Sequence, residues 1–278
     1  MASTQVGGTT AQRPRTHGGG GAHSRARDWA EIQERMLVPL YQAVYDRLEV
    51  GPATSLLGLG CRSGLALLLA AERGAQVSGA EPETELRELA QGRGLPVSAD
   101  GYEAHGERTA TALPRTAHSL VTVFDQLPGT EDPAPLMAEA ARRTLRGGQV
   151  VLAGWGPPER CESASVLDVA HRRAHRGAGR APSAPFALSR PGALEALLAG
   201  AALRPAGSGL VSCPFAYADL ESAVRGMLST GLYRTAVEDS GQAVVAKELE
   251  EALQPYVRPD ASVRMANVFR YVVGDKLR

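Results

Sequence analysis

The chain has 278 residues, 44% of them hydrophobic, and its 30 Lys and Arg residues balance 30 Asp and Glu residues, so the formal net charge is zero. This length accommodates one full α/β core with an insertion or lid, or two small domains. The balanced charge removes the electrostatic case for sequence-independent binding to nucleic acid, which requires a basic surface that displaces counterions.

The cysteines and the hydropathy pattern narrow the class of protein further. Cys61, Cys161 and Cys213 lie far apart and form no CxxC or Cys/His ligand pattern, so neither a disulfide framework nor a metal site is expected. No apolar run reaches the length of a membrane span, and the N-terminus lacks the apolar segment of a secretory signal. We expect a soluble, cytoplasmic protein without nucleic-acid or membrane partners, as a monomer or homodimer.

The N-terminal part of the chain divides into two segments. Residues 1–27 are rich in Gly, Thr, Ser and Arg and show no hydrophobic period, which predicts a disordered tail. From Asp28, an N-cap residue, apolar side chains recur at helical spacing as far as Leu48, which predicts an amphipathic helix. We expect Pro39 to bend or break this helix.

Strands and helices then alternate along the chain. The expected elements are strand 55–59, helix 64–73, strand 76–80, helix 83–91, a short strand near Val97, strand 119–124, helix 133–145 and strand 149–155. Such an alternation predicts a doubly wound α/β fold, in which a mainly parallel sheet carries helices on both faces.

Residues 157–190 interrupt this alternation. Several prolines flank an Arg/His-rich stretch there, which predicts a lid or a substrate-facing insertion. Its basic cluster either attracts an anionic substrate or solvates a helix, and the second interpretation is favoured; the cluster comprises His171, Arg172, Arg173, His175 and Arg176. Helix 191–200, strand 209–217, helices around 218–230 and 242–254, and strand 267–273 complete the expected domain, residues 28–278.

The first strand runs into a glycine turn that predicts a ligand site. In an open parallel sheet a ligand binds beyond the carboxyl ends of the strands, where the strand order reverses. Gly60 and Gly64 supply the dihedrals and the close backbone approach that such a site needs. Glu81 follows the second strand, at the position where a carboxylate accepts hydrogen bonds from both hydroxyls of a ribose. The alternative for Glu81 is a solvated acid at a helix N-terminus.

Five segments carry a resemblance to a known family when they are taken in order. They are residues 56–64, 77–81, 119–127, 139–152 with the turn Gly147-Gly148, and 155–159. Together they resemble the class I S-adenosylmethionine-dependent methyltransferases, particularly the small-molecule branch related to ubiquinone and menaquinone C-methyltransferases. The resemblance covers residues 29–274 and implies a seven-stranded, Rossmann-like sheet whose last pair includes an antiparallel edge, with a helical lid.

The resemblance implies transfer of a methyl group from S-adenosyl-L-methionine to a small organic acceptor. Such an in-line displacement is catalysed mainly by holding two substrates in near-attack geometry, so no fixed catalytic residue is expected. By analogy, Gly60, Ser63 and Gly64 face the methionine and ribose parts of the cofactor. Glu81 faces the ribose, and residues 124–127, beginning with Phe124, face the methionine end beside the acceptor.

Three positions depart from the family's pattern. Gly58 stands where an acid is usual, and Arg62 stands at the middle glycine of the loop. Arg62 either crowds the cofactor and opposes its sulfonium charge, turns outward, or pairs with the cofactor carboxylate. Thr109 stands where an acid usually meets the adenine amino group, and Asp100 is the rival candidate for that contact.

Two other functions remain open at this point. A methyltransferase-like protein that has lost the reaction and binds another ligand or a protein partner accounts for Gly58 and Arg62. A nicotinamide-dependent oxidoreductase is the third possibility, because Gly58-x-Gly60-x-x-Ser63 approximates a dinucleotide fingerprint, although Ser63 replaces its third glycine.

The remaining candidates have both a functional and a structural interpretation. His118, just before the fourth strand, is a candidate general base, although a partly exposed turn histidine is more common. Cys61 lies at a helix N-terminus, where a thiol pKa can fall, or it simply packs. Tyr41, Tyr45 and Trp155 either line an acceptor pocket or pack in the core and lid.

Overall fold

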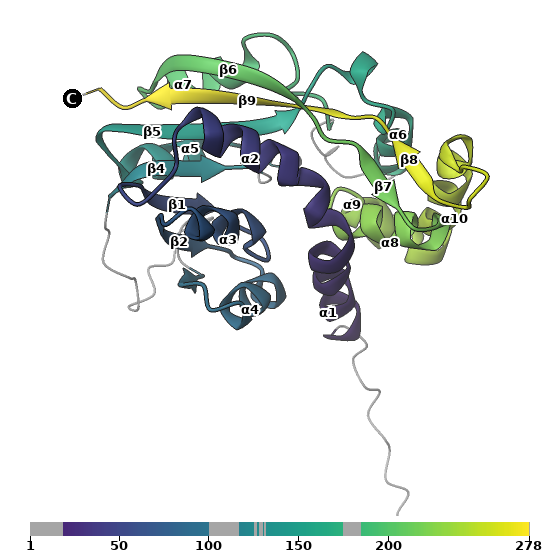
Figure 1. Cartoon of the computed structure of the whole chain (residues 1–278). Coiled ribbons are helices and arrows are strands. Elements are labelled where there is room, and N and C mark those ends of the chain that lie inside the picture. Colours follow the sequence, from purple (N-terminus) through teal and green to yellow (C-terminus); the bar gives the residue numbers. More distant parts are fainter. Residues whose placement is uncertain are drawn as a thin grey trace, which may run out of the picture.

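Seven strands form one sheet in the computed structural model of the chain, in the order β3-β2-β1-β4-β5-β9-β6 (Figure 1). The structure describes residues 19–99, 117–124, 127, 130, 132–174 and 185–277. The strands are β1 (Ser55–Leu59), β2 (Gln76–Ala80), β3 (Val97–Ser98), β4 (His118–Val123), β5 (Thr144–Trp155), β6 (Arg204–Ser212) and β9 (Val268–Asp275).

The pairing of the strands places a ligand site at one edge of the sheet. β1 pairs in parallel with β2 and with β4, and β4 pairs in parallel with β5. β9 runs antiparallel between β5 and β6. The strand order reverses between β1 and β4, so the carboxyl ends of these strands border the crevice in which doubly wound folds bind ligands. The doubly wound, mainly parallel fold with seven strands is confirmed.

Helices cover both faces of the sheet and bury its apolar side chains. On one face lie α2 (Val38–Arg47), α3 (Leu65–Glu72) and α4 (Thr84–Gly92), whose apolar residues belong to one core cluster. On the other lie α5 (Ala134–Arg143) and α7 (Ala193–Gly200), which pack on β1, β4, β5 and β9. Both faces of the strands are therefore buried, which explains why β1 is a nearly continuous apolar run.

A helical layer lies beyond the end of the sheet toward which β5 points (Figure 1). It contains α6 (Ala164–Ala174), α8 (Leu220–Ser229), α9 (Arg234–Ser240) and α10 (Gln242–Leu253), with the short antiparallel pair β7 (Phe215–Tyr217) and β8 (Val263–Met265). α6 contacts α9 and α10. Most of this layer comes from residues 215–265, so the expected lid of residues 157–190 supplies only part of it.

The N-terminal helical stretch is irregular before Pro39 and continues as a regular α-helix from the turn that contains it. A π-helical turn, η1 (Trp29–Gln33), and a 3-10 turn, η2 (Glu34–Leu37), precede α2, whose first turn contains Pro39. Proline has no amide hydrogen, so it is tolerated in the first turn of a helix and not in its interior. The expected break at Pro39 is confirmed. The expected tail is corrected at its end, because α1 (Gly19–Asp28) is helical; residues 1–18 lie outside the described part.

Two strand predictions were wrong at their boundaries. The expected strand 209–217 is two strands, β6 and β7, with Pro214 between them, because proline cannot donate to a ladder. β5 begins at Thr144 rather than at Gln149, and its register with β4 shifts after the pair His118 and Thr144. The turn at Gly147, with φ of +78°, is accommodated in this irregular start of the strand.

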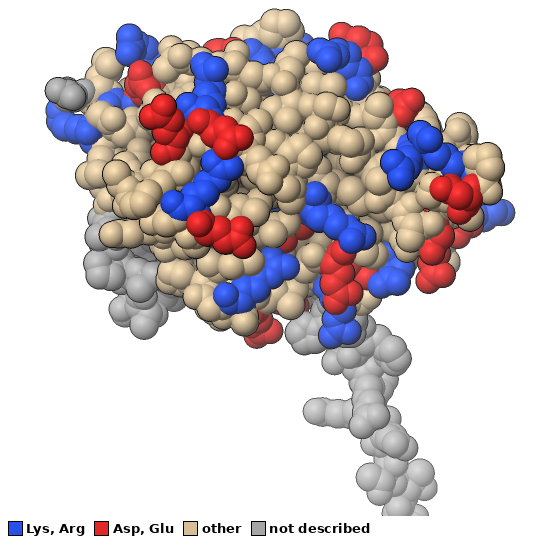
Figure 2. All heavy atoms as spheres, viewed as in Figure 1, with Lys and Arg blue, Asp and Glu red and all other residues tan. Residues whose placement is uncertain are grey.

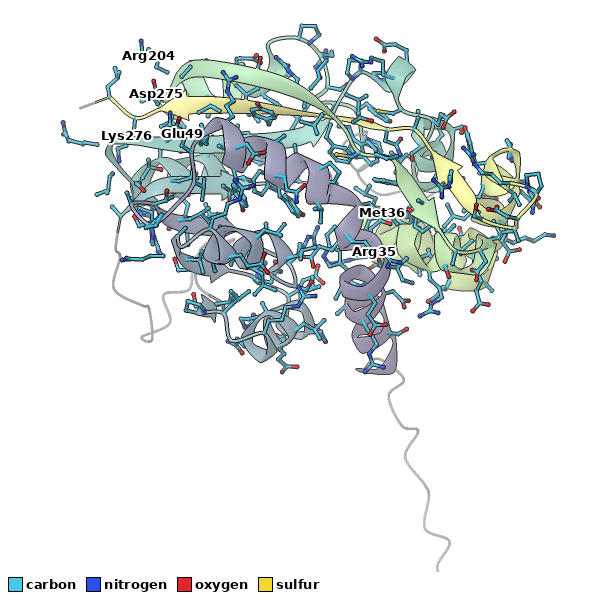
Figure 3. The ribbon with its side chains drawn as sticks, in the orientation of Figure 1. Arg35, Met36, Glu49, Arg204, Asp275 and Lys276 are labelled. Atoms are coloured by element: carbon cyan, nitrogen blue, oxygen red, sulfur yellow. The ribbon has the colours of Figure 1, made fainter. Side chains whose placement is uncertain are left out.

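Polar contacts fasten the far edge of the sheet. Arg204 and Asp275 face one another across β6 and β9 (Figure 3), with 3.1 Å between Nη2 and Oδ2. The Lys276 ammonium donates to the carbonyl oxygens of Ala141 and Thr144 at 2.7 Å each.

On the face in Figure 2, basic and acidic side chains are interspersed. Among the described helices, none combines the length and apolar character that crossing a membrane demands.

Candidate functional site

The glycine turn joins β1 to α3 and reaches across to the end of β2. Gly60 and Gly64 have φ of +63° and +86°, the left-handed region that glycine adopts without strain. The amides of Gly60 and Cys61 donate to the Ala80 carbonyl oxygen at 2.8 Å and 3.2 Å. Gly64 caps the start of α3. The turn therefore sits at the carboxyl ends of both strands, as the sequence predicted.

Close packing around Gly58 accounts for the absence of an acid at this position. A Cβ on Gly58 would lie 3.1 Å from both Cys61 Cβ and Leu67 Cδ2. A Cβ on Gly79, the β2 residue in register with Gly58, would lie 2.6 Å from Cys61 Sγ. Burial raises the pKa of the Cys61 thiol, so the packing interpretation of this cysteine holds. The side chains of Cys61 and Leu67 fill the space in which an acid at position 58 would lie.

Glu81 is anchored beside the glycine turn. Its Oε2 accepts a hydrogen bond from the Arg62 amide at 2.8 Å, and its Oε1 accepts one from the Glu83 amide at 2.9 Å. The residue is fully buried, and this burial raises the pKa of its carboxyl group. A carboxylate has about four lone-pair sites, so each oxygen keeps acceptor capacity beyond the bond it already makes.

Arg62 adopts a left-handed backbone, with φ of +52°, which is costly for a residue with a Cβ. Its guanidinium lies 5.3 Å from the centre of the Trp29 ring, within the range of a cation–π contact. Its Nη1 lies 3.5 Å from Glu83 Oε1. The side chain thus leads from the turn toward η1 and toward the start of α4.

The Glu83 carboxylate pairs with arginines from three segments. Besides Arg62, Arg25 of α1 lies at 2.6 Å and Arg234 of α9 at 3.0 Å from its carboxylate oxygens. Burial works to raise the pKa of Glu83, but the three guanidinium groups outweigh it and hold that pKa below its ordinary value. Arg25 and Arg234 also line a groove of about 730 Å3 between α1, α8 and α9. Glu83 therefore fastens two helices to the glycine turn.

A second buried acid, Glu34 of η2, reaches the same turn. Its Oε2 accepts from the Ser63 hydroxyl and, at 3.2 Å, from Arg93 Nη1, while its Oε1 accepts from the Leu65 amide at 3.2 Å. Glu34 is 1% exposed, and burial raises the pKa of its carboxyl group. Because Leu65 begins α3, this carboxylate occupies the helix N-terminus, where negative charge is favoured. The sequence offered no signal for Glu34, since 29 residues separate it from Ser63.

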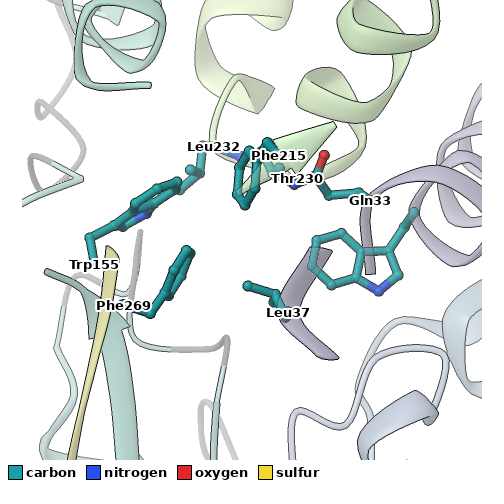
Figure 4. A pocket seen from close by; sticks show the side chains of 8 residues that line it. Gln33, Leu37, Trp155, Phe215, Thr230, Leu232 and Phe269 are labelled. Atoms are coloured by element: carbon teal, nitrogen blue, oxygen red, sulfur yellow. The ribbon is translucent and has the colours of Figure 1, made fainter. Parts of the chain in front are cut away.

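Aromatic side chains line a small cavity, and none of the described residues in its wall is charged (Figure 4). Trp29, Trp155, Phe215 and Phe269 contribute rings, and Gln33, Leu37, Thr230 and Leu232 complete the wall. The Trp155 ring centre lies 4.5 Å from that of Phe269 and 5.7 Å from that of Phe215. The cavity measures about 20 Å3, room for about one water molecule.

The structure separates the aromatic candidates. Phe124 is buried, with its ring centre 5.0 Å from Tyr41 and 6.1 Å from Tyr45. The Tyr45 hydroxyl donates to the Ala66 carbonyl oxygen at 2.8 Å. These three rings pack together between α2 and the sheet, so Tyr41 and Tyr45 follow the packing interpretation. Trp155 lines the aromatic cavity, and the sequence did not connect Trp29 with it.

The place of His118 in the fold argues against its candidate role as a general base. His118 is the first residue of β4, whereas the ligand edge lies at the strand's other end. About six residues at roughly 3.3 Å each put some 20 Å between the two ends. The imidazole is buried, and burial together with Arg143 lowers its pKa. His118 therefore lies at the amino-terminal end of β4, away from the glycine turn at the carboxyl ends of the strands.

Several predicted residues lie outside the described part of the chain. These are both candidates for the adenine contact, Thr109 and Asp100, and the side chains of the basic cluster in residues 171–176. Within the described residues, no group of three His, Cys, Asp or Glu side chains is arranged to hold a metal ion.

Residues 57–152 match the family model of the methyltransferase domain. No curated protein sequence matches the chain. A candidate methyltransferase from Bacillus halodurans is 14% identical, with 86% of this chain and 99% of that chain covered and a TM-score of 0.53. Escherichia coli YjhP is 16% identical, with 90% and 98% covered and a TM-score of 0.52.

A third solved structure, the [4+2]-cyclase SpnF, is 16% identical, with 86% of this chain and 80% of that chain covered and a TM-score of 0.50. At such identities these structures show the fold. The family match covers the glycine turn, Glu81 and strands β1 to β5, the part of the sheet that builds the site. Residues 57–152 are thus similar to the methyltransferase domain family, and the solved structures show that the sheet has the fold of the class I methyltransferases.

Proposed function

We propose that the protein transfers a methyl group from S-adenosyl-L-methionine to a small organic acceptor. The observation that carries the proposal is the placement of Glu81, a buried carboxylate held against the glycine turn by the Arg62 amide. The family match favours methyl transfer. It also removes the reason for the oxidoreductase alternative, because the same turn belongs to the matched domain.

The described residues fit the ribose end of this cofactor. Glu81 keeps free lone pairs on both oxygens for two ribose hydroxyls, and Gly60 and Gly64 present bare backbone to a ligand. When bound, the cofactor supplies an electrophilic methyl group. The chain's own contribution is to orient the two substrates and exclude water, which needs no proton-transfer residue unless the accepting atom must lose a proton.

Replacing Glu81 with glutamine tests this proposal. We expect the affinity for S-adenosylhomocysteine, measured by isothermal calorimetry, to fall at least tenfold, because a hydrogen bond to a charged group contributes about 1.5–3 kcal/mol. Glu88→Gln, which removes an exposed acid on α4, is the matched control and should bind as the wild type does. An unchanged affinity of a Glu81→Gln protein that is folded by circular dichroism contradicts the role of Glu81.

A second function is favoured by one observation, the Arg62 guanidinium between Trp29 and Glu83. A protein of this fold that binds another ligand or a protein partner would keep such a cation at the turn. The cyclase SpnF shows that proteins of similar fold carry other reactions.

The variant Arg62→Gly separates the two functions. Under the first proposal we expect wild-type protein to bind S-adenosylmethionine, with Arg62→Gly changing the dissociation constant by less than about tenfold, since a cation–π contact contributes about 1 kcal/mol. Binding that is absent in the wild type at millimolar ligand and is restored by Arg62→Gly supports the second function. Calorimetry with both S-adenosylmethionine and S-adenosylhomocysteine measures the binding of each ligand to the wild type and to Arg62→Gly.

We also propose that the protein acts in the cytoplasm as a monomer or homodimer. The three cysteines are free thiols, two of them buried, which is typical of a reducing compartment.

A further inference from the structure

We propose that the aromatic cavity is the acceptor subsite and that its occupant is an uncharged, planar aromatic compound. This inference rests on the proposed function, since it assigns the second substrate of the same site. The cavity is walled by Trp29, Trp155, Phe215 and Phe269, together with four uncharged residues. The walls come from η1, η2, β5, β7, β9 and the connection between α8 and α9.

The cavity lies close to the glycine turn. Trp155 is the last residue of β5, at the carboxyl edge of the sheet where doubly wound folds bind their ligands. Trp29 lines the cavity and also carries the Arg62 guanidinium, whose backbone amide binds Glu81. The Trp29 side chain therefore contacts both the cavity and the Arg62 side chain of the glycine turn.

The chemistry of the walls selects an uncharged occupant. None of the described residues lining the cavity carries a charge, so an anionic group would lose its hydration without gaining a countercharge. Aromatic walls suit a flat ring, because offset and edge-on ring contacts are favourable at centroid separations of about 4.5–7 Å. The separations among Trp155, Phe215 and Phe269 already lie between 4.5 Å and 6.2 Å.

A cationic occupant is the alternative that aromatic walls suggest, since ring faces attract ammonium groups. Here the Trp29 ring already carries a cation, Arg62, at 5.3 Å. A second positive charge in the cavity would be repelled by that guanidinium, and none of the described lining residues supplies a negative charge. The arrangement therefore favours a neutral ring over a cation.

Binding requires the cavity to widen from its volume of about 20 Å3. Three of its walls, Trp29, Gln33 and Leu37, belong to the π-helical and 3-10 turns η1 and η2. Such turns within a helical stretch often mark hinges and functional sites. Thr230 and Leu232 lie between α8 and α9 rather than within a helix. One wall is thus formed by η1 and η2 and another by the connection between α8 and α9. We expect the cavity to widen at these two walls, since strands β5 and β9, which carry Trp155 and Phe269, can then stay in place.

Tryptophan fluorescence reports on this cavity. The chain contains two tryptophans, and both line the cavity. We choose three nitroaromatic quenchers of one ring size: neutral 4-nitrotoluene, anionic 4-nitrobenzoate and cationic 4-nitrobenzylammonium. With the full-length protein at neutral pH we expect saturable quenching by 4-nitrotoluene, with a dissociation constant at least tenfold lower than for either charged probe.

The variant Leu232→Glu tests the location of the probe. Leu232 is a half-buried wall residue, so a carboxylate there should weaken 4-nitrotoluene binding at least tenfold and strengthen 4-nitrobenzylammonium binding. The matched control is Leu145→Glu, where the leucine is 44% exposed and lies near the start of β5, at the opposite end of that strand from the wall residue Trp155; it should bind as the wild type does. If Leu232→Glu fails to fold, the ranking of the three probes on wild-type protein still decides.

Several results overturn the proposal. Equal or tighter binding of a charged probe to the wild type contradicts a neutral occupant, and non-saturable quenching by all three probes contradicts a ligand site. Unchanged 4-nitrotoluene binding by folded Leu232→Glu places the probe elsewhere. These titrations contain no cofactor, so their failure is distinct from failure of the proposed function, which appears as loss of S-adenosylhomocysteine binding in calorimetry.

Discussion

Replacing Gly64 with alanine is expected to lower the free energy of unfolding by about 3 kcal/mol. Two effects add at this position. Gly64 has φ of +86°, where a residue with a Cβ is strained, and its added Cβ would lie 2.4 Å from Leu95 Cδ1 and 3.2 Å from Ala90 Cβ. Leu95 can turn its methyl group away, but the Cβ of Ala90 is fixed to the backbone of α4, so the start of α3 must shift.

Gly94→Ala is the matched control for this prediction. Gly94 has φ of +78°, but no atom lies within 4 Å of its added Cβ, so the control isolates the backbone strain, about 1 kcal/mol. Urea denaturation followed by circular dichroism measures both variants. Equal losses in the two would show that the contact with Leu95 and Ala90 contributes nothing. In that case the tight packing at the glycine turn would not explain its sequence.

Removing the buried carboxylate of Glu34 is the second large effect that we expect. Glu34→Ala leaves the Ser63 hydroxyl and the Leu65 amide without their acceptor. It also removes the carboxylate that pairs with Arg93, which keeps its hydrogen bonds to Ser63. Breaking a buried ion pair on one side costs about 3–5 kcal/mol. Because the Arg93 side chain is 28% exposed, solvent screening reduces this, and we expect a loss of about 2–3 kcal/mol.

The same residue gives a pH dependence with a definite sign. Burial raises the folded-state pKa of Glu34 above its ordinary value of 4.5. The folded protein then binds more protons than the unfolded chain above that value. The corresponding contribution to stability is fully present below about pH 4.5 and is lost as the pH rises through the folded pKa.

Glu34→Gln provides the measurement, because glutamine does not titrate. The free energy of unfolding of the wild type, relative to that of Glu34→Gln, should fall as the pH rises above the ordinary carboxyl pKa of 4.5. Glu88→Gln, on the exposed side of α4, should show no such shift. A wild-type to Glu34→Gln difference that is constant with pH would mean that the carboxyl group titrates at its ordinary pKa.

The sequence predicted the parts of the fold that depend on local pattern. Strands 55–59 and 76–80 match β1 and β2 residue for residue. β1 is a short apolar run bounded by turn residues, as expected of a parallel strand buried on both faces. Gly60, Gly64 and Glu81 come together as expected because the β1–α3–β2 unit fixes their spacing. These are contacts between residues about twenty positions apart, within one supersecondary unit.

The remainder of the site depends on contacts that no local pattern encodes. Glu34 and Trp29 reach the turn only because α1, η1 and η2 dock on it from far away in the sequence. Arg62 is recognisable in the sequence as a departure from a motif, but nothing local indicates its contacts with Trp29 and Glu83. α9 was missed because seven residues with a mixed pattern give little periodicity.

The three guanidinium groups that share the carboxylate of Glu83 have a consequence for the kinetics of the protein. They belong to α1, to the glycine turn and to α9, so opening any one of these segments changes the electrostatic energy of the other two. Because the three cations repel one another and share one anion, a ligand that displaces Arg62 strengthens the pairing of Glu83 with Arg25 and Arg234, and this coupling is reciprocal. Release of either helix is therefore slower once Arg62 has been displaced, and a rise in ionic strength weakens this effect because it screens the charges.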